Sequence, residues 1–305
     1  MVRDMNYDEV VAAMFQPSPP DAVAEPTVGA STARRLRDAF EPIAMHSVWS
    51  RQTCERLADL GLDFFGSYVW GRAAALGDPD VGVVVASFAV FSPDLIGTVY
   101  GLAHAACPRD VLLAERRQAT VASLAAALDG EDVSGVADAL AVAVGAADGT
   151  GRPLFSGLRS QPWPDDPIGR LWRACELARE HRGDSHVAAC VVRGLDPVEM
   201  NVLTELWVGM PLGSYSATRG WSPDQIATAV DRLTHLGSLD DDGRLTAAGR
   251  AVRDDIEAVT DAMEQSIVDA LGDDVDAIID QLDAWSARCI AAGAFPPDVF
   301  KRAAG

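Results

Sequence analysis

One segment, Trp221–Glu264, constrains the fold more than any other, because it carries consecutive signals for the ends of helices. Its first signal, Ser-Pro-Asp-Gln at 222–225, combines a capping serine, a proline for the first turn and a glutamine three residues after the cap. Apolar residues follow at helical spacing until Gly237, which predicts a helix. The turn signal Asp-Asp-Asp-Gly at 240–243 then separates two short predicted strands, and Thr246 caps a last long helix.

A second group of signals predicts two helices before this segment. A long helix is expected from about Ile168 to Val192, because Arg193-Gly194 supplies a glycine for a left-handed C-terminal cap. The next helix is expected to begin at Asp196-Pro197, with Glu199 completing the cap. The fold class expected is therefore mainly α: a helical N-terminal region followed by a winged helix-turn-helix with a small β-hairpin wing.

Composition divides the chain into five expected segments. Prolines gather in an irregular N-terminal segment (1–31), and Ala-rich sequence with helical spacing predicts a helical domain (32–150). A Pro-rich, extended connection (151–167) leads to the long helix and the winged helix-turn-helix (168–265). A C-terminal helix (266–305) follows, and its apolar stripe is expected to pack on the chain's own core, with a second chain as the alternative.

Charge limits the partners of the chain. It carries 25 basic against 45 acidic residues, a formal net charge of −20, and so repels phosphate backbones unless basic groups gather in one place. The stretch 219–264 has five arginines against ten acidic residues. DNA binding is therefore not expected, and the winged helix is expected to serve in packing or docking. Lys301 is the only lysine, so nearly every cation is a guanidinium, which suits planar pairing with carboxylate or phosphate.

Cysteine usage and apolar runs indicate the compartment. The five cysteines are scattered without a C-x-x-C pair, which argues against disulfides and thiolate zinc sites and for a reducing cytoplasm. No signal-peptide pattern is present, and the most apolar run, Val81–Phe91, is too short to span a bilayer. Motifs for metal, nucleotide, flavin and serine-hydrolase chemistry are absent, so neither a metal nor a cofactor is expected.

The densest group of functional polar side chains lies at 179–186. On the expected helix, Arg182 and His186 are one turn apart and face the same way. An arginine beside a histidine can hold an anion next to a proton donor or acceptor, so we expect His186 to be catalytic. Four further residues of this helix are expected to bind substrate: Arg182, Asp184, Arg179 and Trp172. The alternative is that Arg182 and Asp184 only pair with neighbouring segments.

A second candidate region lies in the N-terminal half. Aromatic residues gather at 64–72 around two glycines, and such a stretch can wall an apolar cavity in which Tyr68 and Arg72 orient a substrate. His46 is expected as a second catalytic histidine. The alternative is that these aromatic side chains are ordinary core.

Several motifs resemble known families. The stretch "GWSPDQIATAVDRLTHLGSLDDDGRLTAAGRAVRDDIEAVTD" (220–261) is similar to the recognition helix, wing and following helix of MarR-type winged-helix proteins. The wider chain resembles an uncharacterised actinobacterial helix-turn-helix family through four further motifs: "GRAAALG" (71–77), "GRPL" (151–154), "PWPDDP" (162–167) and "REHRGDSHVAA" (179–189). This resemblance implies a helical N-terminal region joined to a winged helix, and it implies a histidine two residues before His46, where this sequence has Ala44.

Three functions follow as hypotheses. The first is a small-molecule-binding protein, including an enzyme of specialised metabolism, whose ligand carries an anionic group held by Arg72 and Arg182 while His186 or His46 moves a proton. The second is a ligand-responsive winged-helix transcription regulator. The third is a non-catalytic interaction subunit that docks a second copy or another protein.

Overall fold

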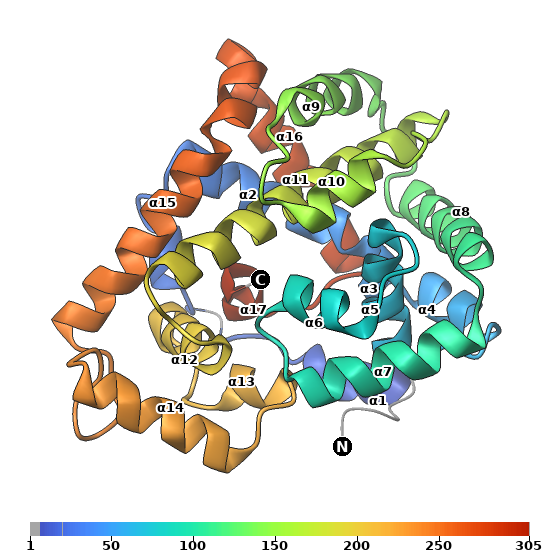
Figure 1. Cartoon of the computed structure of the whole chain (residues 1–305). Coiled ribbons are helices and arrows are strands. Elements are labelled where there is room, and N and C mark those ends of the chain that lie inside the picture. Colours follow the sequence, from blue (N-terminus) through green and yellow to red (C-terminus); the bar gives the residue numbers. More distant parts are fainter. Residues whose placement is uncertain (1–6, 20, 305) are drawn as a thin grey trace.

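The computed structural model describes residues 7–19 and 21–304, and most of them lie in α-helices (Figure 1). The first half contains α1 (Tyr7–Met14), α2 (Thr32–Ala44), α3 (His46–Trp49), α4 (Arg51–Ala58), α5 (Phe64–Ala73), α6 (Val81–Phe88), α7 (Pro93–Ala106), α8 (Arg109–Ala127) and α9 (Ser134–Ala146). The second half contains α10 (Pro153–Arg159), α11 (Pro167–Val192), α12 (Pro197–Val208), α13 (Ser214–Thr218), α14 (Pro223–His235), α15 (Ala247–Leu271), α16 (Val275–Ala291) and α17 (Val299–Ala304). Short 3-10 turns are η1 (Glu25–Thr27), η2 (Ala74–Leu76) and η3 (Gly272–Asp274). The prediction of a mainly α fold is confirmed.

The predicted helix ends in the second half are confirmed. Asp196 caps α12 and Ser222 caps α14, each in a reciprocal capping box with the residue three positions later. The Thr246 side chain accepts a hydrogen bond from the Gly249 backbone N–H and starts α15. After α11, Gly194 takes a left-handed conformation with φ of 73°. These ends depend on contacts within a few residues, which is why the sequence predicts them.

The predicted β-hairpin wing is wrong. No β-strand occurs within the described residues, and a single backbone bridge joins Leu239 to Leu245. The segment between the end of α14 and the Thr246 cap has no room for longer strands. A turn takes up its middle, where the Asp240 carboxylate accepts from the backbone N–H of Asp242 and Arg244. The helix-turn-helix is therefore followed by a turn in place of a wing.

Two segments expected to be irregular contain helices. The N-terminal segment includes α1. The Tyr7 hydroxyl donates to the Trp49 carbonyl, and the Asp8 carboxylate accepts from Arg51, so these bonds join α1 to α3 and α4. The Pro-rich connection includes α10, because Pro153 sits in the first turn, where proline is tolerated, and the Asp184 carboxylate accepts from the Phe155 N–H. This last contact joins residues far apart in sequence, so local patterns could not reveal it.

The five-segment division itself stays a prediction. The largest apolar cluster combines residues of the helical domain, the long helix and the C-terminal helix, including Phe40, Trp172 and Trp285. The apolar stripe of α16 is buried in this cluster, so packing on the chain's own core is confirmed. None of the described helices is both long enough and apolar enough to cross a membrane.

Helix α11 passes through the middle of the fold and packs against α2, α9 and α15. It buries charged residues along its length, Glu180, Arg182 and Asp184 among them. Helix α17 lies at the centre of the view in Figure 1, surrounded by other helices. Its Ala303 carbonyl accepts from Arg34 Nη2 at 2.7 Å, and the Arg302 carbonyl accepts from Arg37. Arginines of α2 and carbonyls of α17 therefore meet in the interior.

Candidate functional site

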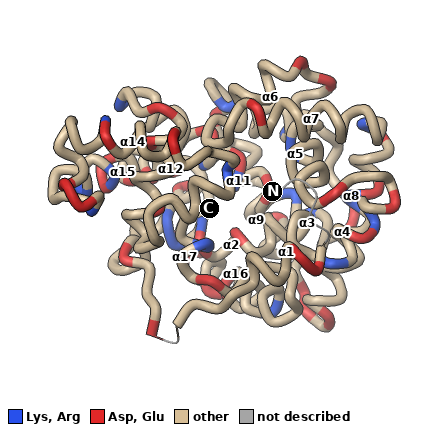
Figure 2. The backbone as a smooth tube through the Cα atoms, turned by 90° about the horizontal axis from the view of Figure 1, so that it is seen from below, with Lys and Arg blue, Asp and Glu red and all other residues tan. Residues whose placement is uncertain are grey.

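A cavity of about 140 Å³ lies among α2, α5, α11, α12, α15 and α17. Its wall is rich in arginine: among the described residues, seven arginines line it against three acids. The arginines are Arg34, Arg37, Arg72, Arg179, Arg182, Arg219 and Arg253, and the acids are Glu41, Asp184 and Glu257. Three further carboxylates, Asp38, Glu180 and Asp261, do not line the cavity but pair with five of these arginines, so the excess is one positive charge. The whole protein carries a net charge of −20, so this wall has the opposite sign from the rest of the molecule. Figure 2 shows acidic positions spread around the rim of the molecule.

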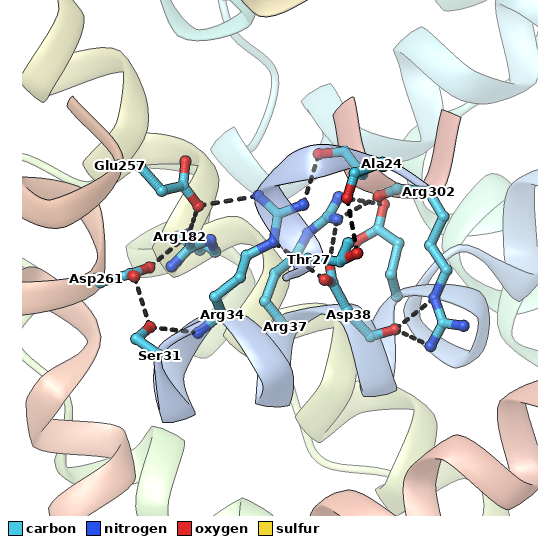
Figure 3. Close-up of polar contacts among 12 residues, drawn as sticks. Ala24, Thr27, Ser31, Arg34, Arg37, Asp38, Arg182, Glu257, Asp261 and Arg302 are labelled. Atoms are coloured by element: carbon cyan, nitrogen blue, oxygen red, sulfur yellow. Dashed lines mark hydrogen bonds and ion pairs between the residues drawn. The ribbon is translucent and has the colours of Figure 1, made fainter. Parts of the chain in front are cut away.

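One carboxylate holds several of these arginines (Figure 3). Glu257 on α15 accepts from Arg34 Nη1 at 2.9 Å, Arg182 Nη2 at 2.5 Å and Arg253 Nη1 at 2.9 Å. Burial alone would raise the pKa of Glu257, but Arg253, Arg182 and Arg34 together hold it well below the usual value. Glu257 is therefore ionised at neutral pH, and it fixes three guanidinium groups that come from three different helices.

Several guanidinium N–H groups at this cavity donate no hydrogen bond to a described residue. Arg182 Nη1 and Arg219 Nε are buried and have no hydrogen-bond partner within the described part of the chain. Arg37 Nη2 is also buried without a hydrogen bond, and its nearest carboxylate oxygen is Glu41 Oε1 at 3.6 Å. Arg37 and Arg182 are only 2% and 7% exposed. Buried donors are normally satisfied, so donors left over at a cavity wall are available to a bound acceptor.

Helix α11 brings four predicted site residues to this cavity, and α5 brings two more: Arg179, Arg182, Asp184, His186, Tyr68 and Arg72. Arg182 and His186 line the same cavity, and their roles in binding and catalysis stay predictions. Arg72 forms a two-pronged ion pair with Glu180, at 2.8 Å from Nε and 2.7 Å from Nη2, and donates to the Tyr68 hydroxyl. Arg179 pairs with Glu41 at 3.2 Å. These contacts hold the arginines in fixed positions.

Two titratable side chains of α11 have strongly shifted pKa values. Burial, helped by Arg253, lowers the pKa of His186 to about 3, so the imidazole is neutral at pH 7. Burial raises the pKa of Asp184 to about 7, although the Phe155 N–H lowers it in part. A neutral imidazole can donate one hydrogen bond to a ligand and accept another, whereas transferring a proton to the ligand at neutral pH requires the charged form.

Two predicted site residues lie away from the cavity. His46 is fully buried, bonds Ser123 Oγ at 2.9 Å and has its pKa lowered by burial to about 4. Trp172 is 1% exposed and lies in the main apolar cluster, where the Arg116 guanidinium stacks 5.1 Å from its ring. Trp172 shares a helix with Arg182 but lies more than two turns away, at the level of the core.

The sequence reasoning missed most of the cavity wall. Arg34 and Arg37 belong to α2, Arg219 follows α13, and Arg253 and Glu257 belong to α15. These residues are far apart along the chain, so no local sequence pattern shows that they cluster. The available signal was the helical spacing of Arg34, Arg37 and Glu41 on the same helix as the buried Phe40 and Ile43.

Gly183 marks an opening in α11. A Cβ atom built at Gly183 would meet no described atom within 4 Å, and the residue lines the cavity. A glycine inside a helix can mark close approach by another backbone or by a ligand, and no backbone of another described segment approaches Gly183 within 4 Å of a built Cβ. A glycine inside a helix costs about 1 kcal/mol relative to alanine, and here the missing side chain leaves the cavity open.

Metal binding receives no support from the described residues, which contain no group of three or more His, Cys, Asp or Glu able to hold an ion. The five cysteines are buried free thiols.

No curated protein and no solved structure matches the chain. One family model, described as a helix-turn-helix family, matches residues 33–296. That range includes the helix pair α12 and α14 and nearly all of the helices that surround the cavity. The chain therefore belongs to this helix-turn-helix family.

Proposed function

We propose that this protein binds a small anionic molecule in the arginine-lined cavity. The observation that carries the proposal is the group of seven arginines around a space of about 140 Å³ in a protein whose net charge is −20. Arg182 Nη1 and Arg219 Nε have no hydrogen-bond partner among the described residues. Guanidinium groups in a confined, weakly hydrated space bind carboxylate or phosphate more strongly than they do in open water.

The ion pairs within the wall support this role. Arg34, Arg182 and Arg253 share Glu257, and Arg182 also contacts Asp261 at 2.7 Å. A purely structural network would match its charges, because an uncompensated buried charge is costly. Here seven arginines meet six acids, so one positive charge remains in excess, and Arg219 has no ion pair among the described residues. The fixed arginines lose little entropy when a ligand binds.

We propose that the helix-turn-helix of this chain is a packing module that forms part of the cavity wall. Met200, Asn201 and Thr204 of α12 line the cavity. The Val90 carbonyl, between α6 and α7, accepts from Asn201 Nδ2 at 2.7 Å and from Trp221 Nε1 at 2.9 Å. These bonds anchor the module to the N-terminal half.

The charges of the module are unfavourable for DNA. Arg232 on α14 pairs with Asp196 and Glu199, and Arg244 in the following turn pairs with Asp240 and Asp242. A phosphate backbone would have to compete with these carboxylates.

A transcription regulator remains the second candidate because the family is named for a helix-turn-helix. A gel shift with mixed duplex DNA at about 50 mM salt tests it, since electrostatic binding is strongest there. A shift at micromolar protein would favour the regulator over a packing module.

Calorimetric titration with inorganic phosphate, at constant ionic strength set with sodium chloride, tests the anion site. We expect saturable binding by the wild type. Gly183→Ala adds a methyl group at the cavity wall, where no atom of another described segment lies within 4 Å. The methyl group takes up space beside the arginines, so this variant should bind phosphate more weakly than the wild type.

Gly101→Ala is the matched control. Gly101 also lies inside a helix, α7, has no atom of another described segment within 4 Å of a built Cβ, and is not among the residues that line the cavity. Both variants should gain about 1 kcal/mol of stability from helix propensity. Equal phosphate affinity of the two variants, or no saturable binding by the wild type, would contradict the proposed site.

A further inference from the structure

A second, larger cavity of about 360 Å³ lies beside the arginine-lined one. Its wall is mainly apolar and includes five aromatic side chains that do not line the first cavity, Trp49, Phe64, Phe65, Phe295 and Phe300. These side chains come from both ends of the chain. A space of this kind suits the hydrophobic body of a small molecule.

The two cavities share one wall. Six residues line both of them: Glu41, Tyr68, Phe91, Arg179, Tyr215 and Arg219. Arg219 has its guanidinium 4.1 Å from the Tyr215 ring centroid and 4.8 Å from that of Phe91. These two aromatic rings hold this cation at the boundary, and its Nε has no hydrogen-bond partner among the described residues.

The shared wall also carries the charges of the apolar cavity. Of its described lining residues, Glu41, Arg179 and Arg219 belong to the shared wall, and the remaining charged ones are Asp298 and Lys301. Those two already have partners, since Lys301 Nζ donates to the Met14 carbonyl at 2.6 Å and Asp298 accepts from Ser18 Oγ at 2.7 Å. The opposite charges of Lys301 and Asp298 cancel, so away from the shared wall the apolar cavity favours an uncharged occupant.

We infer that the two cavities form one site for an amphipathic organic anion, whose carboxylate or phosphate lies among the arginines and whose apolar body fills the aromatic cavity. The inference rests on the proposed anion site and adds the class of ligand. The volumes of about 140 Å³ and about 360 Å³ together fall in the range of small-molecule sites, roughly 300–1,000 Å³. Arg219 and Arg179, which face both spaces, would contact the ligand where its polar and apolar parts meet.

A chain-length series tests the inference on the wild-type protein. Calorimetric titrations compare acetate, hexanoate and decanoate, then decyl phosphate and decan-1-ol. We expect decanoate to bind at least tenfold more tightly than acetate, because added methylene groups leave water for the aromatic cavity. Decan-1-ol should bind at least tenfold more weakly than decanoate, because it has no charge for the arginines. The ratio of decanoate to decyl phosphate affinity identifies the preferred anion.

Val48→Phe is the variant that separates the two cavities. Val48 lines only the apolar one, and a phenyl ring there reduces the space for an alkyl chain. We expect decanoate affinity to fall at least tenfold and inorganic phosphate affinity to stay within twofold. Thermal unfolding of the variant checks that it is folded, and the chain-length series stands without it.

The outcomes are distinguishable. Phosphate binding with equal affinities for acetate and decanoate would overturn the amphipathic ligand and leave the anion site intact. Decan-1-ol binding as tightly as decanoate would overturn the coupling of the two cavities. Absence of binding by phosphate, decanoate and decyl phosphate alike would overturn both the inference and the proposed function.

Discussion

Removing the Glu257 carboxylate is the most informative perturbation of the arginine cluster. Glu257→Gln keeps the size of the side chain and removes the charge shared by Arg34, Arg182 and Arg253. Arg34 retains Asp38 and Arg182 retains Asp261, so each keeps one acidic partner. Among the described residues, Arg253 keeps a hydrogen bond to Thr204 Oγ1 at 3.4 Å and its stacking on Trp207, but no acidic partner.

The expected loss of stability follows from this partial compensation. Breaking a buried ion pair costs about 3–5 kcal/mol, and the remaining partners favour the lower end, about 3 kcal/mol. With an unfolding entropy of about 2.1 cal/mol/K per residue over 305 residues, this loss lowers the melting temperature by about 5 °C.

The same change should strengthen anion binding. Two unit charges about 8 Å apart interact by about 2 kcal/mol at an effective dielectric constant of about 20. Salt screening reduces this repulsion between Glu257 and a bound phosphate to about 1 kcal/mol, so phosphate should bind Glu257→Gln about fivefold more tightly. The variant therefore loses stability and gains affinity, a combination that a general folding defect would not produce.

Calorimetry and thermal unfolding measure both effects, with Asp255→Asn as the control. Asp255 lies two residues away on α15 and pairs with Arg193 at the surface, where an ion pair contributes about 0–1 kcal/mol. The pKa of Glu257 is lowered in the folded state, so its contribution is fully present above the unfolded value near pH 4.3 and is lost as the pH falls through the folded value. A melting-temperature difference below about 1 °C at pH 7, or a weaker phosphate affinity in Glu257→Gln, would refute the reasoning.

Two further predictions concern buried groups. The pKa of His46 is lowered by burial to about 4, so the unfolded state takes up a proton first, and stability should be lost at about 1.4 kcal/mol per pH unit as the pH falls from about 6.5 to 4. Urea unfolding at pH 7, 6 and 5 should show this loss in the wild type and a smaller one in His46→Asn, and identical slopes would contradict it. Glu205 is fully buried and accepts from the backbone N–H groups of Gly213, Tyr215 and Ser216, so Glu205→Ala should destabilise the fold by about 2–4 kcal/mol. Urea unfolding measures this as well, and a loss below about 1 kcal/mol would mean that the first turn of α13 does not depend on Glu205.

The sequence predicted what local contacts determine. The caps at Asp196, Ser222 and Thr246 each involve residues within three positions, so their signals are complete in a short window. The prediction of a wing was wrong, although the turn signal at Asp240 is correct. Strand length depends on how many residues lie between this turn and the Thr246 cap, and they are enough for only one backbone bridge.

The cavity was predicted only in part, because its wall is assembled from distant segments. Helical spacing predicted the site residues that lie on α11, such as Arg182. Arg34 and Arg253 look like ordinary surface residues in sequence, and their burial follows from packing α2 and α15 against α11. An arginine becomes a site residue here through tertiary packing, which no pattern of spacing encodes.

The acidic exterior around a basic interior has a kinetic consequence. An anion approaching the molecule meets the repulsive field of a surface with net charge −20 before it reaches the arginines, so its association is slowed at low salt. Added salt screens that field over about 10 Å at 0.1 M and should accelerate association, while it weakens the attraction inside the cavity less. The proposed ligand would then exchange slowly in both directions, and its residence time, more than its rate of capture, would set its affinity.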